Sequence, residues 1–154
     1  PDGKKIAFSK QVLVEKLMGK DKYSDTPKTT AQVYTDLNHR HWDYFNEGKY
    51  NHVFVVNTTS NVDSAKDLLE GKTWDSPQRP FGGAEDFIFS PDSSQLLYVT
   101  KPKSGKEYST STNTDIFAYD LATGTTKNLT ESNKGLCIPF APGISSFSGY
   151  ISIN

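Results

Sequence analysis

The sequence predicts an all-β fold made of short antiparallel strands. Aromatic residues make up 12% of its 154 residues, whereas all apolar residues together reach only 34%. Bulky rings favour the pleated, half-buried surface of a sheet over a helix. A turn of the form Pro-Asp-small residue, followed by an apolar strand, stands at residues 1–9 and again within residues 89–100. The chain therefore contains a repeat, and a chain that begins inside a repeat is expected to be part of something larger.

In the first half of the chain, alternation predicts a strand from about Lys4 to Val14. Residues 15–30 are polar and Lys-rich, and Gly and Pro interrupt them, which predicts a loop. Residues 31–50 follow neither a period of 2 nor one of 3.6 for long, so only a short strand or a helical turn is expected there. An apolar strand at 52–57 and a short strand at 67–71 complete this half.

The second half predicts strands at 84–89, 95–100, 114–120 and 125–130. A Ser-Pro-Asp-Ser turn separates the first two of these strands. The last two are joined by Asp120–Gly124, where the Asp can start an Asx-type turn and the Gly can adopt positive φ. Four short strands in sequence, closed by turn residues, form one blade-sized sheet of a β-propeller.

Propeller repeats are typically spaced by roughly 40–50 residues. The string FAPG at 140–143 stands one such period after the turn at 89–92, but the opening turn lies too far back, by about one loop. We therefore predict a partial β-propeller of about two four-stranded antiparallel blades. Residues 1–71 form an incomplete first blade that lacks its innermost strand and carries a long insertion at about 10–50. Residues 72–134 form the second blade, and residues 135–154 begin a third blade or form an altered tail.

Composition excludes several classes of partner and cofactor. A net charge of −1 and a pI near 6.4 leave no electrostatic footprint for nucleic acid or for an anionic membrane surface. No apolar run approaches the ~18 residues of a membrane span. The single cysteine, Cys137, excludes an internal disulfide and a cysteine-based zinc site. We expect no nucleic-acid partner, no membrane partner and no cofactor.

One group of residues has the spacing of metal ligands. His39 and His41 stand two apart, and Asp43 continues the same alternation. A tetrahedral zinc site needs more convergent ligands than these. We therefore favour a structural corner in which Trp42 is packed and the histidines are partly solvated, and we predict no metal site. Three further aromatic residues are expected to pack between the blades: Trp74, Phe81 and Phe87.

Two stretches resemble the prolyl oligopeptidase family of serine peptidases. Ser90-Pro91-Asp92-Ser93, followed by DIFAYDL at 115–121 and NLT at 128–130, is similar to the propeller repeat of that family, which periplasmic TolB-type propellers share. The segment RHWDYFNEGKYNHVFVV at 40–56 looks like the acylaminoacyl-peptidase and dipeptidyl-peptidase 5 branch. The resemblance covers nearly the whole chain up to Gly135 and fades beyond it.

The resemblance implies an α/β-hydrolase domain in the intact protein, whose nucleophile needs a Gly-x-Ser-x-Gly elbow. The nearest string here, GISSFSG at 143–149, has the wrong glycine spacing. We thus expect no catalytic residue in this chain. The expected function is that of a non-catalytic propeller segment that restricts the access of short peptides to the hydrolase domain. By the same resemblance, the intact protein is expected to be periplasmic or otherwise exported from a bacterium. The alternative is a TolB-like or WD40-like propeller that binds another protein.

Glu85 and Asp86 are the candidate substrate-binding residues. The pair opens the predicted strand at 84–89, and the innermost strand of a propeller blade lines the central channel. In the enzymes that the resemblance suggests, that channel faces the active site, where the free amine of a peptide needs an anionic anchor. The alternative is a solvated carboxylate pair at a strand entrance. Two blades outside a closed ring also leave open strand edges, so we expect the isolated chain to self-associate.

Overall fold

The structure is a computed structural model that describes residues 1–37, 39–133, 136–139 and 150–153. Within these residues most of the regular structure is antiparallel β-sheet, with two short α-helices. This confirms the predicted all-β class. The sheets do not close into a ring. None of the described helices has the length and apolar character needed to cross a membrane.

The first sheet has three strands in the order β1-β4-β5, which are β1 (Lys5–Leu13), β4 (Lys49–Asn57) and β5 (Lys66–Asp67). β1 and β4 pair over their full length. All three strands were predicted, but β5 is shorter than the predicted 67–71. The side chain of Asp67 accepts a hydrogen bond from the backbone N–H of Leu69 at 2.8 Å, which turns the chain away from β4. A short 3₁₀ turn, η1 (Val62–Ser64), precedes β5.

The second sheet has four strands in the order β6-β7-β8-β9. Three follow the predicted ranges closely: β7 (Gln95–Thr100), β8 (Asp115–Asp120) and β9 (Thr126–Asn128). The predicted strand at 84–89 is only half correct. Residues Ala84–Asp86 form a 3₁₀ turn, η2, and the strand β6 covers Phe87–Phe89 alone. The buried carboxylate of Asp86 is engaged by the loop before it, which holds these residues in a turn.

The repeated Pro-Asp turns have the same backbone conformation. In each, the Asp side chain accepts a hydrogen bond of 3.0 Å from the N–H two residues later, at Asp2 and at Asp92. The next residue takes positive φ, 71° at Gly3 and 60° at Ser93. The two turns also touch, because the N–H of Asp2 donates to the Ser93 hydroxyl at 3.0 Å. β1 and β7 follow these turns; β1 is an edge strand of its sheet, and β7 is the second strand of the other sheet.

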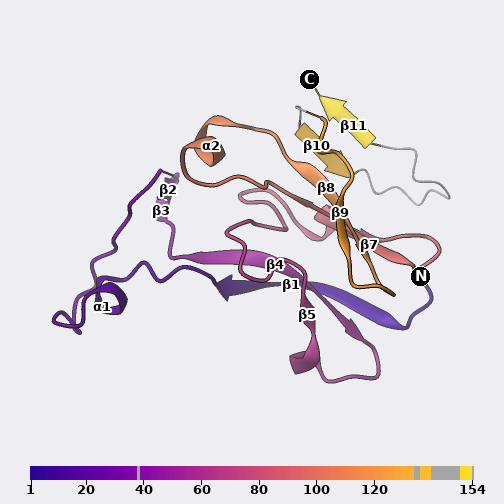
Figure 1. Cartoon of the computed structure of the whole chain (residues 1–154), viewed down its shortest axis with the longest axis horizontal. Coiled ribbons are helices and arrows are strands. Elements are labelled where there is room, and N and C mark those ends of the chain that lie inside the picture. The colour runs from indigo at the N-terminus through magenta and orange to yellow at the C-terminus, as the bar shows by residue number, and fades with distance from the viewer. Residues whose placement is uncertain (38, 134–135, 140–149, 154) are drawn as a thin grey trace.

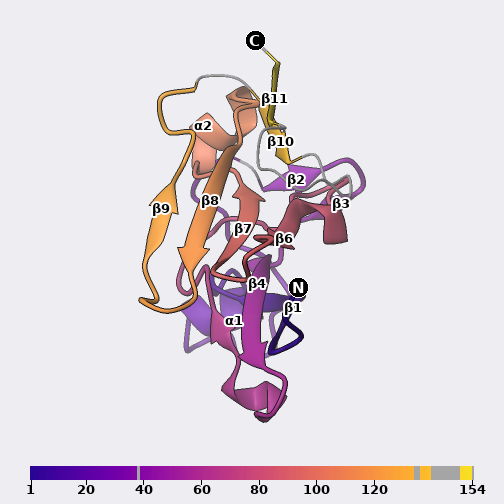
Figure 2. The same ribbon diagram turned by 90° about the vertical axis from the view of Figure 1, so that its right-hand side faces the viewer.

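The main core joins the two sheets. Its buried members come from the first sheet and the segment after it (Val53, Val55 and Leu69) and from β7 (Leu96 and Tyr98). Trp74 and Phe87 pack against this cluster, as predicted. Phe81 does not, because 78% of its surface is exposed. Figure 2 shows the strands of both sheets meeting around this centre.

The insertion between β1 and β4 projects away from the sheets, with α1 (Gly19–Lys22) at its far end (Figure 1). It also carries a hairpin of two short strands, β2 (Arg40–His41) and β3 (Tyr44–Phe45). The prediction that Trp42 is packed is wrong. It occupies the tip of this hairpin with φ of 49° and is 64% exposed, and the rings of His41 and Phe81 lie near it.

Helix α2 (Gly105–Thr110) lies in the connection between β7 and β8. At the C-terminal end, β10 (Leu136–Pro139) pairs antiparallel with β11 (Tyr150–Ile153), and β10 contacts β7 and β8. The strings FAPG at 140–143 and GISSFSG at 143–149 lie outside the described residues. The assignment of 135–154 to a third blade or an altered tail stays a prediction.

Candidate functional site

A cleft of about 550 Å³ lies where three distant parts of the chain meet. One wall comes from the β2–β3 hairpin and the start of β4. A second comes from residues 75–81, between the two sheets. The third comes from the connection that carries α2, from Lys101 to Thr114. No single segment of the sequence contains this site.

The second wall is fixed to β4 through Asp75. Its carboxylate accepts a hydrogen bond from the N–H of Asn51 at 2.7 Å, and its carbonyl accepts one from the Thr100 hydroxyl at 2.9 Å. The next residue, Ser76, donates its N–H to the Asn51 carbonyl at 2.8 Å. Burial raises the pKa of the Asp75 carboxyl, while the Asn51 N–H and the Arg79 guanidinium oppose that rise. These bonds keep residues 75–79 rigidly at the edge of the cleft.

Arg79 lies in the same wall with 24% of its side chain exposed. One Nη donates to the carbonyl of Lys49 at 2.8 Å. Its Nε lies 3.1 Å from the Asp75 carboxylate, an ion pair whose alignment is not that of a hydrogen bond. The guanidinium is thus held in place by a backbone carbonyl and one carboxylate.

Lys101 is the most unusual group of the cleft. The residue is only 9% exposed. Its ammonium donates to the carbonyl of Tyr108 at 2.5 Å and lies 4.1 Å from the centre of the Tyr108 ring. Within the described residues, no carboxylate lies within ion-pair distance of this ammonium. Burial lowers the pKa of Lys101, and Lys103 adds to this effect. A buried cation without a carboxylate partner is costly, and such groups are rare outside functional sites.

Gln78 adds a polar group of a different kind. Its amide nitrogen donates to the Tyr108 hydroxyl at 2.6 Å. Its amide oxygen is buried and accepts no hydrogen bond from the described residues. Burial, helped by the charge of Asp75, raises the pKa of the Tyr108 hydroxyl to about 12. Buried acceptors normally have a donor.

The cleft is positively charged as a whole. Four cationic side chains and one carboxylate line it, which gives a formal charge of +3 with His41 neutral; they are Arg40, Lys49, Arg79, Lys101 and Asp75. Lys49 is paired with the exposed Glu47 at 2.8 Å. Aromatic rings from Tyr44 and Phe81 stand at the same cleft. The whole chain has a net charge of −1, so this local excess of positive charge is not a consequence of composition.

The structure separates the two predicted substrate-binding residues. Glu85 is exposed, whereas Asp86 is 8% exposed. The Asp86 carboxylate accepts a hydrogen bond from the N–H of Gln78 at 2.7 Å. Burial raises the pKa of Asp86, and the Glu85 charge adds to this rise. Neither residue is among those that line the cleft. Through this hydrogen bond Asp86 instead holds Gln78, a residue of the cleft wall. The role of the pair in substrate binding stays a prediction.

The histidines occupy different environments. His39 lies beside Tyr34, with 5.5 Å between ring centres, and His41 lies beside Trp42 at 5.2 Å. Both histidines are exposed. Among the residues that the structure describes, no three His, Cys, Asp or Glu side chains gather as a metal site would require.

His52, by contrast, is fully buried in β4. Its Nδ1 lies 2.8 Å from the Asp67 carboxylate, and its Nε2 lies 3.0 Å from the Lys72 carbonyl. A carbonyl oxygen can only accept, so Nε2 carries a hydrogen. His52 therefore joins β4 to β5 and to the turn that follows, and its role is structural.

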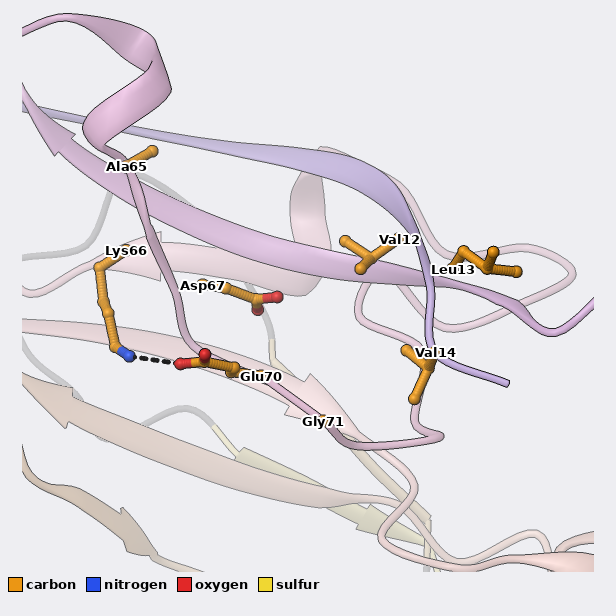
Figure 3. Close-up of a pocket in the computed structure, with 8 residues that line it drawn as sticks. All are labelled: Val12, Leu13, Val14, Ala65, Lys66, Asp67, Glu70 and Gly71. Atoms are coloured by element: carbon orange, nitrogen blue, oxygen red, sulfur yellow. Dashed lines mark hydrogen bonds and ion pairs between the residues drawn. The ribbon is translucent and has the colours of Figure 1, made fainter. Parts of the chain in front are cut away.

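A second hollow, of about 460 Å³, lies between the end of β1 and the segment around β5 (Figure 3). Its apolar wall is Val12–Val14, and its nearest ion pair is Lys66 with Glu70, at 2.8 Å. Both of these side chains are more than half exposed, and such solvent-exposed pairs contribute little to stability. Asp67 also borders the hollow, but His52 engages its carboxylate. This hollow therefore presents fewer polar groups to a ligand than the cationic cleft does.

Sequence comparison identifies relatives of the chain. No family model matches it. It is 39% identical over 136 residues to dipeptidyl-peptidase 5 of Porphyromonas gingivalis, a match that covers 88% of this chain and 20% of that protein. The chain is related to dipeptidyl-peptidase 5. The protein of that name from Porphyromonas endodontalis is 38% identical over 87% of this chain and 19% of its own length. The one from Schizosaccharomyces pombe is 31% identical over 71% of this chain and 17% of its own length.

The chain spans about one fifth of the length of these relatives. No solved structure matches it. The relationship agrees with the branch that the RHWD segment indicated, and it extends over residues of both sheets.

The residues of the cationic cleft were not predicted from the sequence. Lys101, Gln78 and Arg79 are ordinary residues in polar segments, and nothing local marks them. One weak signal was present: Lys101 directly follows the apolar strand β7, where a strand end can place a long side chain at a sheet edge. Finding the cleft required the packing of the insertion against the two other walls.

Proposed function

We propose that this chain is part of the β-propeller of a dipeptidyl-peptidase-like serine hydrolase of the prolyl oligopeptidase family. The observation that carries the proposal is the 39% identity to dipeptidyl-peptidase 5 over 88% of the chain. The two consecutive antiparallel sheets, each with a Pro-Asp turn before one of its strands, support it, because propeller blades repeat in this way. In this proposal the first sheet corresponds to a blade that lacks its innermost strand.

The proposed role of the segment is to restrict which peptides reach the hydrolase domain of the intact protein. A propeller in front of a catalytic domain admits extended or short chains and excludes folded ones by size. The nucleophile would come from the hydrolase domain, since the 154 residues contain no Gly-x-Ser-x-Gly string. Export from a bacterial cell, as for a periplasmic enzyme, remains part of the proposal.

The test is to express the complete coding region that contains this chain and to supply peptides of 4, 10 and 30 residues and a folded protein. The expected result is release of N-terminal dipeptides, detected by mass spectrometry, at rates that fall as the substrate lengthens. Equal rates for short peptides and the folded protein would rule out gating. A coding region with further propeller repeats and no Gly-x-Ser-x-Gly elbow would favour a TolB-like or WD40-like protein-binding module instead.

We also infer that the isolated chain self-associates through the outer edge of β1. The N–H of Val14 donates to the Gly48 carbonyl, and the N–H of Thr58 donates to the Lys4 carbonyl. Even-numbered residues of β1 therefore bond to β4, and odd-numbered residues direct their N–H and C=O groups away from it. Within the described residues β1 pairs with β4 alone. A nine-residue edge of this kind is a template for strand pairing.

A further inference from the structure

We propose that the cationic cleft is a carboxylate-binding site for short peptides. The ligand would place a carboxylate at the cationic side chains Lys101 and Arg40 and an apolar side chain at the rings of Tyr44 and Phe81. This inference goes beyond the proposed function, because it concerns binding by this chain itself and not the cleavage of a peptide.

The first argument is the state of Lys101. The residue is only 9% exposed, and the partners of its ammonium are a carbonyl and the face of the Tyr108 ring. Both are weaker partners than an anion, because neither carries a net charge that balances the charge of the ammonium. An ammonium has three donors, and one of them is used by the Tyr108 carbonyl. A carboxylate in the cleft would supply the missing opposite charge.

The second argument is the position of the two guanidinium groups. Arg40 donates its Nε to the carbonyl of Trp42 at 2.8 Å, and Arg79 donates one Nη to that of Lys49. Each guanidinium is therefore held by a backbone carbonyl at the cleft and retains further N–H donors. Asp75 offsets one positive charge in the wall, and its carboxylate is already engaged by the Asn51 N–H and the ion pair with Arg79. The cleft thus retains an excess of positive charge for a ligand.

The third argument selects a peptide among possible anions. An inorganic anion has no apolar part, whereas aromatic side chains line the cleft beside the cations. A peptide supplies an apolar side chain close to its carboxylate. Tyr44 and Phe81 also line the cleft, and 78% of the Phe81 surface is exposed, so these rings offer apolar contact to a neighbouring side chain. The carboxylate can be a peptide C-terminus or an acidic side chain, and the chemistry of recognition is the same.

The test titrates the ¹⁵N-labelled 154-residue chain with three peptides and follows the amide shifts of the cleft. The peptides are acetyl-Ala-Ala-Ala with a free C-terminus, the same peptide as its C-terminal amide, and acetyl-Ala-Glu-Ala-amide. Binding of the free acid alone assigns the site to a C-terminus, and binding of the Glu peptide alone assigns it to an acidic side chain. Binding of both supports recognition of either source. Equal binding of the neutral amide, or no binding of either acid, overturns the proposal.

Three variants locate the site. Lys101→Met removes the buried charge and keeps the length of the side chain, and it should weaken binding of the acid by about tenfold or more. Arg40→Gln changes an exposed side chain, so the fold should be retained, and it should weaken binding about threefold. Lys127→Met, on β9 and outside the cleft, is the matched control and should change binding less than about twofold. Circular dichroism checks that each variant is folded.

If Lys101→Met does not fold, Arg40→Gln alone decides. An unchanged affinity in Arg40→Gln, or an equal loss in Lys127→Met, overturns the proposal because the binding would then be unspecific attraction of charge. The peptides are not hydrolysed in this experiment, so a negative result would leave the proposed peptidase relationship standing.

Discussion

Replacement of His52 by Phe tests whether the bond network of this side chain holds the first sheet together. The ring of Phe has a similar size, so the substitution leaves no large cavity in the core. It removes both ring nitrogens, which lie 2.8 Å from the Asp67 carboxylate and 3.0 Å from the Lys72 carbonyl. The variant therefore isolates the polar contribution of a residue that is fully buried.

The expected loss follows from two acceptors that lose a partner: the Lys72 carbonyl loses the Nε2–H, and the Asp67 carboxylate keeps only the bond from the Leu69 N–H. Each buried group that loses its partner costs about 1–3 kcal/mol. Asp67 retains 15% exposure of its side chain, so its carboxylate regains part of its hydration and contributes near the lower limit. We expect His52→Phe to lower the free energy of unfolding by about 3 kcal/mol, a large part of the roughly 5–15 kcal/mol that holds a domain folded.

Asp67→Asn is the matched control. The introduced amide can still accept the Leu69 N–H, as Asp67 does at 2.8 Å, and it can donate to Nδ1 of a neutral imidazole whose Nε2 donates to the Lys72 carbonyl. We expect a loss of about 1 kcal/mol or less. Urea denaturation followed by circular dichroism measures both variants. If His52→Phe costs under about 1 kcal/mol, the network does not hold the sheet. If Asp67→Asn costs as much as His52→Phe, the stabilisation comes from the charge of Asp67 and not from the hydrogen bonds.

Three further predictions concern the turns, the cleft wall and the edge strand. Hydrogen bonds from hydroxyl and amide groups hold the folded-state pKa of Asp92 at about 2, below its usual 3.8. Its contribution to stability is therefore present above pH 3.8 and is lost as the pH falls towards 2. Acid titrations of Asp92→Asn should show a smaller loss of stability over this range, and a titration equal to that of the unsubstituted chain would contradict this prediction. In Gly82→Ala the added Cβ would meet the Asp86 carboxylate, so the free energy of unfolding measured in urea should fall by about 1–3 kcal/mol. An unchanged value would mean that the cleft wall shifts to make room for the methyl group. Ser9→Pro removes an outward N–H of β1 and should make the isolated chain monomeric by light scattering, whereas persistent association would place the contact elsewhere.

Much of the sheet structure was predictable because its causes are local. The run from Gln95 to Thr100 is apolar and is bounded by a Pro-Asp turn, so burial and turn chemistry specify the same strand. β1 also follows a Pro-Asp turn, and β8 is bounded by the Asp120–Gly124 turn. Positive φ at Gly3 and Ser93 belongs to a turn whose residues can be recognised without any knowledge of the fold.

The predictions that were wrong concern residues whose structure depends on contacts with distant parts of the chain. Ala84–Asp86 has no turn signal of its own, and it forms a turn because the Asp86 carboxylate bonds the N–H of Gln78, eight residues earlier. Trp42 and Phe81 are large and apolar, so burial was the natural expectation. Trp42 is exposed because it lies at the tip of the hairpin in the insertion, away from the core. Phe81 is exposed as well, and its ring lies edge-on to that of Trp42 and not in the core. The cleft was missed for the same reason, since its three walls are distant in sequence.

The outer edge of β1 is unpaired in the isolated monomer but would be covered by another strand in the proposed propeller. In the isolated chain the outward N–H of Ser9 has no partner strand, so Ser9→Pro removes a site of association and leaves the ladder with β4 intact. In an intact propeller the innermost strand of this blade would pair with the same edge, and the same substitution would remove a ladder hydrogen bond and clash with that strand. At concentrations at which the isolated chain is monomeric, Ser9→Pro should therefore leave its thermal stability nearly unchanged but lower that of the complete protein. Equal stability of the two proteins with and without the substitution would mean that no strand covers β1, and the first sheet would not be a propeller blade.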